Sequence, residues 1–408
     1  MTKSISEKEN KAIGKDELSI NRFSDIGKIH VNWDIKELGY FLDYFQPTDF
    51  ISEYVESEKS EINNIPVLTA GKSFILGYTE NNNKTYTRIP VILFDDFTTD
   101  SKYVDFPFQI RSSAAKILIA KKNIDFDFKF VFYAMQQINF VSSDHKRYWI
   151  SEYQFLTIPC PPFKEQELIA KALNTWDIAI NLCKTILAEL QRRKEWLLFE
   201  LLFNNQKYFK SNEIKSLPVS KLLRRIKRPL TPNPLELYTQ IGIRSHTKGI
   251  FYKEAVTGAS LGNKSVFYIE PDCFILNIVF AWEHAIAKTS VREVGMIASH
   301  RFPMYKAIEG ELDLNYLLHF FKSKKGKDLL RLASPGGAGR NKTLGQSEFL
   351  KLQIRVPGID EQKKIAACLD KVDEEILLYE KKFSELKNQR KGLMQQLLTA
   401  KIRVKYEG

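Results

Sequence analysis

The sequence predicts an α+β protein made of two globules of similar mixed α/β fold, each followed by a copy of one long helix. Two observations support this prediction. The stretch from Pro161 to Phe203 recurs from Pro357 onward at a constant offset of 196 residues, and both copies carry apolar residues with a seven-residue period. An offset this large does not fit a stacked repeat, whose period is about 20–50 residues. It indicates an internal repeat in which half of the protein is duplicated.

Both copies of the repeat predict a helix. Pro161-Pro162 and Pro357-Gly358 end whatever precedes them, and Glu165 and Glu361 lie in the first turn, where acidic side chains are favoured. A helix rises 1.5 Å per residue, so about 40 residues form a rod of roughly 60 Å. A rod of this length within one chain is suited to holding two other parts of the protein apart.

The apolar residues of each copy fall into two heptad rows, which is typical of a coiled-coil seam. A basic residue, Lys194 in the first copy and Arg390 in the second, interrupts one row at the same place. Such a residue either extends its charge from the edge of the seam into water, or it fixes the register or docks a partner. The predicted seam residues are Ile169, Leu173, Trp176, Ile180, Leu187, Leu190 and Leu197 in the first helix and Ile365, Leu369, Val372, Ile376, Phe383, Leu386 and Leu393 in the second.

Composition limits the class of protein. A chain of 408 residues that is 44% hydrophobic can form two or three domains with sizeable cores. The net charge of +12 favours a polyanionic partner such as nucleic acid. The four cysteines show neither metal-ligand spacing nor a disulfide framework, and the longest apolar run, residues 273–282, is too short to span a membrane. We therefore expect a cytoplasmic protein without a signal peptide or a membrane segment.

Each globule has short strand-like runs separated by turns, followed by helical segments. Strands are expected at 65–68, 73–78, 86–94 and 116–120 and a helix at 125–138 in the first globule. In the second, strands are expected at 237–243, 265–269 and 273–282 and a helical pair at 314–334. The predicted divisions of the chain are a polar N-terminal extension (1–30), the first globule (31–158), the first long helix (159–204), a linker (205–216), the second globule (217–353), the second long helix (354–401) and a tail (402–408).

The sequence contains no recognisable catalytic motif. Its six histidines show no paired metal-ligand spacing, and no GxSxG nucleophile elbow occurs. Gly336–Thr343, GGAGRNKT, approaches the phosphate loop GxxxxGK(S/T), but Asn341 replaces the glycine before Lys342. This segment is a nucleotide-binding loop, a surface turn or, favoured over both, a flexible loop that lies along DNA. We predict no catalytic residue and no metal site on this chain.

Basic and polar residues recur in loops of both globules. Each loop alone is more often solvated than bound, but recurrence in both globules favours DNA contacts. Phosphate contacts would position a duplex, and Arg or Asn side chains would read base edges. The candidate residues are Lys72, Ser73, Lys84, Arg111, Lys146, Arg147 and Tyr148 in the first globule and Arg244, His246, Lys248, Asn263, Lys264, Ser334, Arg340, Asn341 and Lys342 in the second.

These features resemble a known family. The proline-led helix with the pattern EQxxIAxxLxxxD, present twice behind two variable globules, resembles the specificity subunit of type I restriction–modification systems. In the second globule, IGIRSHTKGIF, NIVFAWEHAIA and ASPGGAGRNKTLGQSEFLK are similar to segments of that family's target recognition domains. The resemblance extends from about Val31 to Lys401, and the duplicated helix is its most specific part.

The resemblance implies that DNA recognition and catalysis lie on different subunits. Each target recognition domain would read one half of a bipartite DNA site, and the two long helices would pack antiparallel, set the gap between half-sites and dock the modification subunits. This non-catalytic chain would bind double-stranded DNA, modification subunits, of which two are expected, and restriction subunits. S-adenosylmethionine, ATP and Mg would bind those partner subunits, which would methylate adenine in DNA and cleave it in an ATP-dependent reaction.

Two other classes remain open from the residues alone. One is an enzyme with an unrecognised nuclease or transferase site, which methylation or cleavage by the purified chain would reveal. The other is a coiled-coil adaptor that does not contact DNA. Binding to duplex DNA that weakens steeply with salt would exclude the adaptor. A rod of roughly 60 Å separates two half-sites by at most about 17 base pairs at ~3.4 Å per step, and by fewer if the globules tilt inward, so we expect a gap below one and a half turns.

Overall fold

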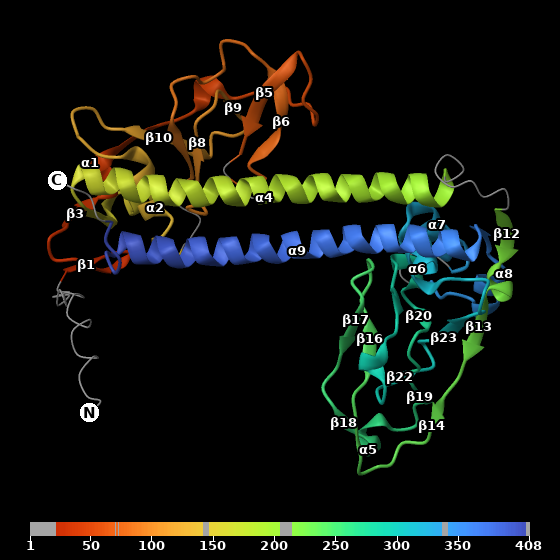
Figure 1. Ribbon diagram of the computed structural model, residues 1–408. Coiled ribbons are helices and arrows are strands. Elements are labelled where there is room, and N and C mark those ends of the chain that lie inside the picture. Colours follow the sequence, from red (N-terminus) through yellow and green to blue (C-terminus); the bar gives the residue numbers. More distant parts are fainter. Residues whose placement is uncertain are drawn as a thin grey trace, which may run out of the picture. The chain divides into compact units, whose positions relative to one another are not determined.

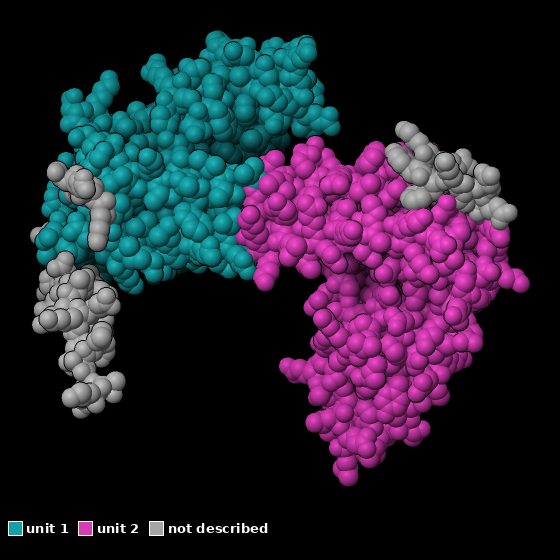
Figure 2. Space-filling view, in the orientation of Figure 1, with its two compact units in different colours: residues 1–182, 383–408 teal, residues 183–382 magenta. Residues whose placement is uncertain are grey.

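The computed structural model describes residues 22–69, 71, 73–141, 147–204, 214–336 and 342–404. Two long helices, α4 (Phe163–Phe203) and α9 (Ile359–Leu398), account for the repeated stretch (Figure 1). The chain forms two compact units, residues 1–182 with 383–408 and residues 183–382 (Figure 2). The boundary falls inside both long helices, so each unit contains one globule and one half of each helix. The predicted division of the chain treated the two long helices as separate segments instead of dividing each between the units.

Unit 1 contains two main sheets. The first is antiparallel with the order β4 (Leu42–Phe45), β10 (Ala115–Ala120), β7 (Val91–Asp95) and β8 (Ser101–Val104). The second has the order β6 (Ile75–Glu80), β5 (Asn63–Leu68) and β9 (Gln109–Ile110), with β5 and β9 parallel. Further elements are the hairpin of β1 (Arg22–Ser24) and β2 (Gly27–Ile29), the pair of β3 (Asp34–Glu37) and β11 (Thr157–Cys160), α1 (Leu38–Phe41), α2 (Phe128–Met135) and α3 (Tyr148–Ser151), and the 3-10 turns η1 (Thr48–Phe50) and η2 (Tyr153–Phe155).

Unit 2 repeats this plan. Its main antiparallel sheet has the order β13 (Leu223–Ile226), β23 (Met304–Ala307), β20 (Phe274–Leu276) and β21 (Ile286–Lys288). A second sheet has the order β14 (Pro229–Leu230), β19 (Val266–Tyr268) and β22 (Ile297–Ser299). The remaining elements are the pairs β12 (Lys215–Pro218) with β24 (Gln353–Val356), β15 (Leu237–Tyr238) with β18 (Val256–Thr257) and β16 (Ile241–Ile243) with β17 (Ile250–Tyr252), the helices α5 (Gly258–Leu261), α6 (Leu314–Lys322), α7 (Lys324–Leu332) and α8 (Gln346–Lys351), and the turns η4 (Val219–Lys221), η5 (Ala281–Glu283) and η6 (Val291–Glu293).

In each unit the main sheet separates two apolar cores. Along β7, Ile92 and Phe94 face the core that contains α2 and the long helices, whereas Val91 and Leu93 face a second core under the other sheet. Successive residues of a strand point to opposite faces. Strand β20 alternates in the same way between two cores of unit 2. Strands buried on both faces read as continuous apolar runs, which is why VILF and CFIL stand out in the sequence.

The two long helices pack against each other with the predicted seam residues turned away from solvent. Each of the fourteen predicted seam residues is buried or half-buried, and Ile169, Leu173, Ile365 and Leu369 are at most 1% exposed. In unit 1, Leu173 of α4 shares a core with Leu397 near the end of α9, and unit 2 combines the end of α4 with the start of α9. The helices therefore run antiparallel within each unit.

Several predicted boundaries move. Residues 22–29 form a hairpin whose Ile29 is fully buried, so this part of the predicted N-terminal extension belongs to the first globule. The strand predicted at 86–94 begins only at Val91. The strand predicted at 273–282 ends at Leu276, because the Asn277 carboxamide accepts a hydrogen bond from the Val279 amide (3.1 Å) and turns the chain. The last residues before each long helix form strands β11 and β24, which shortens both helices at their starts.

Candidate nucleic-acid interface

In unit 2, the loop that connects β20 to β21, residues 277–285, is the centre of the candidate interface. The turn after β16 lies against it, because the amides of His246 and Thr247 donate to the carbonyls of Glu283 and His284 at 2.7 and 3.0 Å. The exposed side chains of Arg244, His246 and Lys248 all belong to this turn. The Arg244 guanidinium stacks 5.0 Å above the ring of Phe251. Three of the predicted contacts are therefore held together beside the 277–285 loop.

The end of the glycine-rich segment reaches the same loop. The Leu344 amide donates to the carbonyl of Ile278 at 2.8 Å, and the ammonium of Lys342 lies 5.6 Å from the centre of the Trp282 ring. The indole of Trp282 donates to the carbonyl of Val279 at 3.1 Å, which fixes the ring. A fixed aromatic ring beside a lysine is suited to contact with a nucleic acid, since it offers both a stacking face and a positive charge.

A third loop joins this face through backbone contacts. The Ile278 amide donates to the carbonyl of Arg301 at 3.0 Å, and the neighbouring His300 amide donates to the carbonyl of Ser265 at 3.3 Å. Ser265 directly follows Asn263 and Lys264, which are both exposed. Loops that are linked in series around residues 277–285 thus carry six of the predicted contacts of the second globule: Arg244, His246, Lys248, Asn263, Lys264 and Lys342.

Sequence reasoning missed Trp282, His300 and Arg301. The apolar run from Cys273 to Trp282 hid the first of them, because it was assigned to a single strand. A signal was present at Asn277, a residue that favours turns. His300 and Arg301 lie in a short turn after β22 that no motif marks.

Positive charge surrounds a buried histidine at this face. Burial, followed by the charges of Lys327, Arg331 and His246, lowers the pKa of His284 to about 4. Its side chain is 8% exposed, and its Nε2 has no hydrogen-bond partner within the described residues. His284 is therefore neutral at pH 7, and the positive potential comes from Lys327, Arg331 and the exposed loop residues.

We expect acid to destabilise the protein through His284. The folded pKa of about 4 lies below the usual 6.5, so the unfolded chain binds the proton more tightly and stability falls as pH drops from 6.5 through 4. Each pH unit contributes about 1.4 kcal/mol, so the loss is on the order of 3 kcal/mol. Urea unfolding between pH 4.5 and 7 measures it. His284 has a φ of 64°, which asparagine tolerates, so His284→Asn should flatten the profile. Parallel profiles for the two proteins would contradict the assignment.

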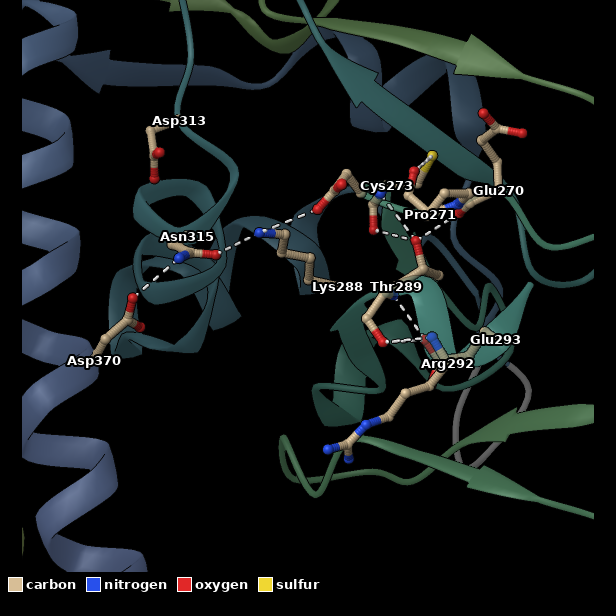
Figure 3. A network of polar contacts seen from close by, with 12 residues as sticks. Glu270, Pro271, Cys273, Lys288, Thr289, Arg292, Glu293, Asp313, Asn315 and Asp370 are labelled. Carbon is tan, nitrogen blue, oxygen red and sulfur yellow. Dashed lines mark hydrogen bonds and ion pairs between the residues drawn. The ribbon is translucent and has the colours of Figure 1, made fainter.

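A polar network anchors the hairpin that carries the 277–285 loop (Figure 3). Asn315 on α6 donates to Asp370 of α9 at 3.0 Å and accepts from the Lys288 ammonium of β21 at 3.0 Å. At the start of β20, the Thr289 hydroxyl donates to the carbonyl of Glu270 at 2.7 Å and accepts from the Cys273 amide at 2.9 Å. The base of the hairpin is thereby tied to the long helix, and its tip is left for contacts.

In unit 1, the parallel pairing of β5 and β9 brings two predicted contacts to one sheet edge. Arg111 follows β9 and Ser73 lies in the turn after β5, and the Arg111 amide donates to the carbonyl of Leu68 at 3.0 Å. Both side chains are exposed. Lys84 is ion-paired with Glu53 at 2.6 Å, so it must leave this partner before it can bind a phosphate.

Two other predictions for unit 1, Arg147 and Tyr148, do not join that edge. Arg147 is exposed at the start of α3, which attaches to the main sheet through Asp96. The prediction for Tyr148 is wrong, because its side chain is 1% exposed and packs against Phe140 in the core. Lys72, Lys146, Arg340 and Asn341 lie outside the described residues.

One prediction for unit 2 is also wrong. Ser334 is 2% exposed, and its hydroxyl donates to the carbonyl of Leu330 at 2.7 Å at the end of α7. It therefore closes a helix and cannot reach DNA. Among the described residues no group of three His, Cys, Asp or Glu side chains could hold a metal ion. Within the same ranges, no helix is long and apolar enough to cross a membrane.

Comparison with known proteins identifies the family. A family profile described as the type I restriction modification DNA specificity domain matches residues 30–192 and 252–388, more than half of the chain. The chain belongs to this family. It is 29% identical over 367 residues to the specificity subunit of the type I restriction enzyme EcoR124I/EcoR124II of Escherichia coli. The aligned stretch covers 85% of this chain and 87% of that protein. The MjaVIII specificity subunit of Methanocaldococcus jannaschii is 22% identical over 324 residues, 72% of this chain and 74% of that protein.

Solved structures agree with the fold. The S subunit of a type I restriction–modification system from M. genitalium superposes with a TM-score of 0.60 at 13% identity, covering 92% of this chain and 99% of that one. The two globules of this specificity subunit are its target recognition domains. Specificity subunits of this family are non-catalytic.

The repeated Glu-Gln motif of this specificity subunit docks each target recognition domain on its long helix. In unit 1, Gln166 accepts from the amide of Asp127 at 3.0 Å and donates to the carbonyl of Pro161 at 2.8 Å. In unit 2, Gln362 makes the same two contacts with Asp313 and Pro357, both at 2.9 Å. Asp127 and Asp313 in turn cap α2 and α6. The motif therefore recurs because the same domain helix must be fixed at each place.

Proposed function

We propose that this specificity subunit recognises a bipartite DNA sequence, with the target recognition domain of unit 1 contacting one half-site and that of unit 2 the other. The observation that carries this proposal is the series of loops around residues 277–285 in unit 2. These loops carry Arg244, Lys248, Arg301 and Lys342, and the ammonium of Lys342 lies 5.6 Å from the centre of the fixed Trp282 ring. Arginine reads guanine through two hydrogen bonds, and lysine binds phosphates. In unit 1, the edge with Ser73 and Arg111 is the corresponding candidate.

We further propose that DNA methylation and cleavage belong to partner subunits, which would hold S-adenosylmethionine, ATP and Mg. One of the solved structures that resemble this chain belongs to a study of complex assembly in a type I system, with a TM-score of 0.50 and 12% identity. A groove of about 710 Å³ in unit 2, lined by Leu198, Phe199, Phe203 and the lysines 322, 324 and 325, offers a surface for a modification subunit. Phe199 is 59% exposed there, as expected of an apolar anchor at an interface. Two such subunits per complex agree with the internal repeat.

The test of the proposed function is the methylation pattern of cells with and without this gene. We expect a bipartite motif that is present only with the gene. The logarithm of the association constant of the purified complex for a duplex with this motif should fall linearly with the logarithm of salt concentration. Absence of a motif, together with binding that salt does not affect, would overturn the proposal.

We expect the gap between the two half-sites to be shorter than one and a half turns of DNA. Helices of 41 and 40 residues extend roughly 60 Å, which corresponds to at most about 17 base pairs, and an inward tilt of the two domains would bring the gap below that limit. The same methylation data measure the gap. A motif whose halves lie two turns apart would contradict the idea that the helix pair sets the spacing.

Replacing Lys342 with alanine should weaken binding to the specific duplex by about 1–3 kcal/mol if the ammonium contacts a base, and less if it contacts only a phosphate. Lys342 lies beside Trp282 at the centre of the candidate interface. Competition binding at fixed salt measures the change. The control is Lys351→Ala on α8, where the ammonium pairs with Glu348 and carries no predicted contact. Equal affinities for wild type and Lys342→Ala would remove this residue from the interface.

A further inference from the structure

Two ion pairs join the long helices, one within each unit. In unit 1, the guanidinium of Arg390 binds both carboxylate oxygens of Asp177, at 2.8 and 3.3 Å. In unit 2, the ammonium of Lys194 lies 2.5 Å from the carboxylate of Asp373. The four side chains are between 17% and 31% exposed. The basic residues that interrupt the heptad rows therefore do not simply extend into water; each one pairs across the seam.

The two pairs are one interaction repeated. Asp373 corresponds to Asp177, and Arg390 corresponds to Lys194, at the repeat offset of 196 residues. On α4, Lys194 of the second pair lies 17 residues after Asp177 of the first pair. On α9, Asp373 of the second pair lies 17 residues before Arg390 of the first pair. Both pairs therefore belong to the same antiparallel register of the two helices.

An apolar heptad seam does not define this register by itself. Moving one helix by seven residues, about 10.5 Å, again sets apolar rows against each other. The ion pairs distinguish the alternatives, since a slip of this size would place the carboxylates of Asp177 and Asp373 against apolar seam residues, where an unpaired charge is costly. The residues they would face are Leu397 and Leu201 after a slip in one direction and Phe383 and Leu187 after a slip in the other.

Each pair has a third partner from the target recognition domain. The Tyr133 hydroxyl of α2 donates to Asp177 at 2.7 Å, and the Lys322 ammonium of α6 donates to Asp373 at 3.1 Å. Burial alone would raise the pKa of Asp373, but the positive charges of Lys322 and Lys194 outweigh it and hold this pKa below its usual range. The carboxylate that selects the helix register thus also contacts the docked domain.

We propose that Asp177, Arg390, Lys194 and Asp373 are positioning residues that select one register of the helix pair and thereby fix the number of base pairs between the two half-sites. The effect on register concerns the chain alone, whereas the effect on the gap rests on the proposed function. A residue that selects a register acts by penalising the alternatives. Exchanging the two charges within each pair should therefore preserve the register, and reversing only one charge should not.

A native cysteine allows the register to be measured in the full chain. The sulfur of Cys183 lies 3.7 Å from the carbonyl oxygen of Tyr379 on the opposite helix. In a Tyr379→Cys variant, mild oxidation should join Cys183 to the introduced thiol, and a slip of seven residues would separate the two by about 10 Å. Peptide mass spectrometry gives the yield of this disulfide. A parent variant that forms none would contradict the register on which the inference depends.

In this background, Arg390→Glu with Lys194→Glu should lower the disulfide yield several-fold. Adding Asp177→Arg and Asp373→Lys should restore it. Like charges in a seam can also impair folding. Asp177→Asn with Asp373→Asn therefore provides a milder variant that keeps the side-chain shape. Its disulfide yield should lie between that of the parent and that of the charge-reversed variant. Yields that stay at the parent value in the reversed and the Asn variants, or that the exchanged charges do not restore, would overturn the proposal.

The same variants, without Tyr379→Cys, are then tested in the complete complex by sequencing the methylated motif. We expect the reversed variant to lose methylation or to methylate motifs with an altered gap, and the charge-exchanged variant to regain the original gap. If the disulfide yields change as expected but the gap does not, the link between register and gap is wrong. If no variant or wild-type complex yields a bipartite motif, the proposed function fails while the disulfide result stands.

Discussion

Replacing Asp96 with asparagine will lower the free energy of unfolding by about 3–5 kcal/mol, as expected when one partner of a buried ion pair loses its charge. The ammonium of Lys116 on β10 lies 3.1 Å from Asp96, and the two side chains are 0% and 3% exposed. The ring of Tyr44 lies 4.7 Å from this ammonium, and within the described residues no second carboxylate pairs with it. The variant therefore leaves a lysine charge buried without a counter-charge. Urea unfolding of the full chain measures the loss.

A second change separates charge from shape in this pair. Asp96 also accepts from the Trp149 amide at 2.8 Å, and the carboxamide oxygen of Asn can keep that bond. Asp96→Asn combined with Lys116→Met removes both charges, so it should recover most of the lost stability. The exposed pair of Lys84 and Glu53 is the control, and Glu53→Ala should leave the unfolding midpoint unchanged. A loss below about 1 kcal/mol for Asp96→Asn would show that water or another group solvates Lys116.

The Asp96 pair illustrates why the burial of Tyr148, one of the predicted DNA contacts, could not be predicted from the sequence. A lysine within the run AKILIA reads as a residue on the polar side of a strand, yet β10 is buried on both faces and Lys116 is paired with Asp96, directly after β7. The Asp96 carbonyl and carboxylate also hold the start of α3, where Tyr148 turns inward. A pattern of basic and aromatic residues cannot tell an exposed tyrosine from one that a distant aspartate directs into a core.

The helix pair, by contrast, was predictable in detail. Its contacts repeat with a period that the sequence displays, and the same residue types recur at the same places in two copies. Gln166 and Gln362 illustrate this, since both fix the cap of a domain helix. The recognition loops carry no such period. The turn at Asn277 depends on one side-chain hydrogen bond, and it moves Trp282 from a predicted strand to the centre of the candidate interface.

Replacing Arg403 with alanine will lower the free energy of unfolding by about 2–3 kcal/mol. Glu165, at the start of α4, is fully buried, and Arg403, beyond the end of α9, binds both of its carboxylate oxygens at 3.1 and 3.0 Å. The only other hydrogen bond to this carboxylate within the described residues comes from the Trp33 indole at 3.1 Å. We expect less than the full cost of breaking a buried pair, typically about 3–5 kcal/mol, because Arg403 is 42% exposed. Urea unfolding measures the change.

The repeat supplies a control for this prediction. Glu361 is the counterpart of Glu165, but its Oε2 is buried without a hydrogen-bond partner in the described residues, and the counterpart of Arg403, Lys207, lies outside them. Removing the charge with Glu165→Gln should rescue Arg403→Ala, because a neutral amide can still accept from Trp33 and no longer needs a cation. Glu361→Gln should cost little, since no described cation balances its charge. If Glu165→Gln instead enlarged the loss of unfolding free energy caused by Arg403→Ala, a group other than Arg403 would stabilise the charge of Glu165. The different surroundings of Glu165 and Glu361 would then need another cause.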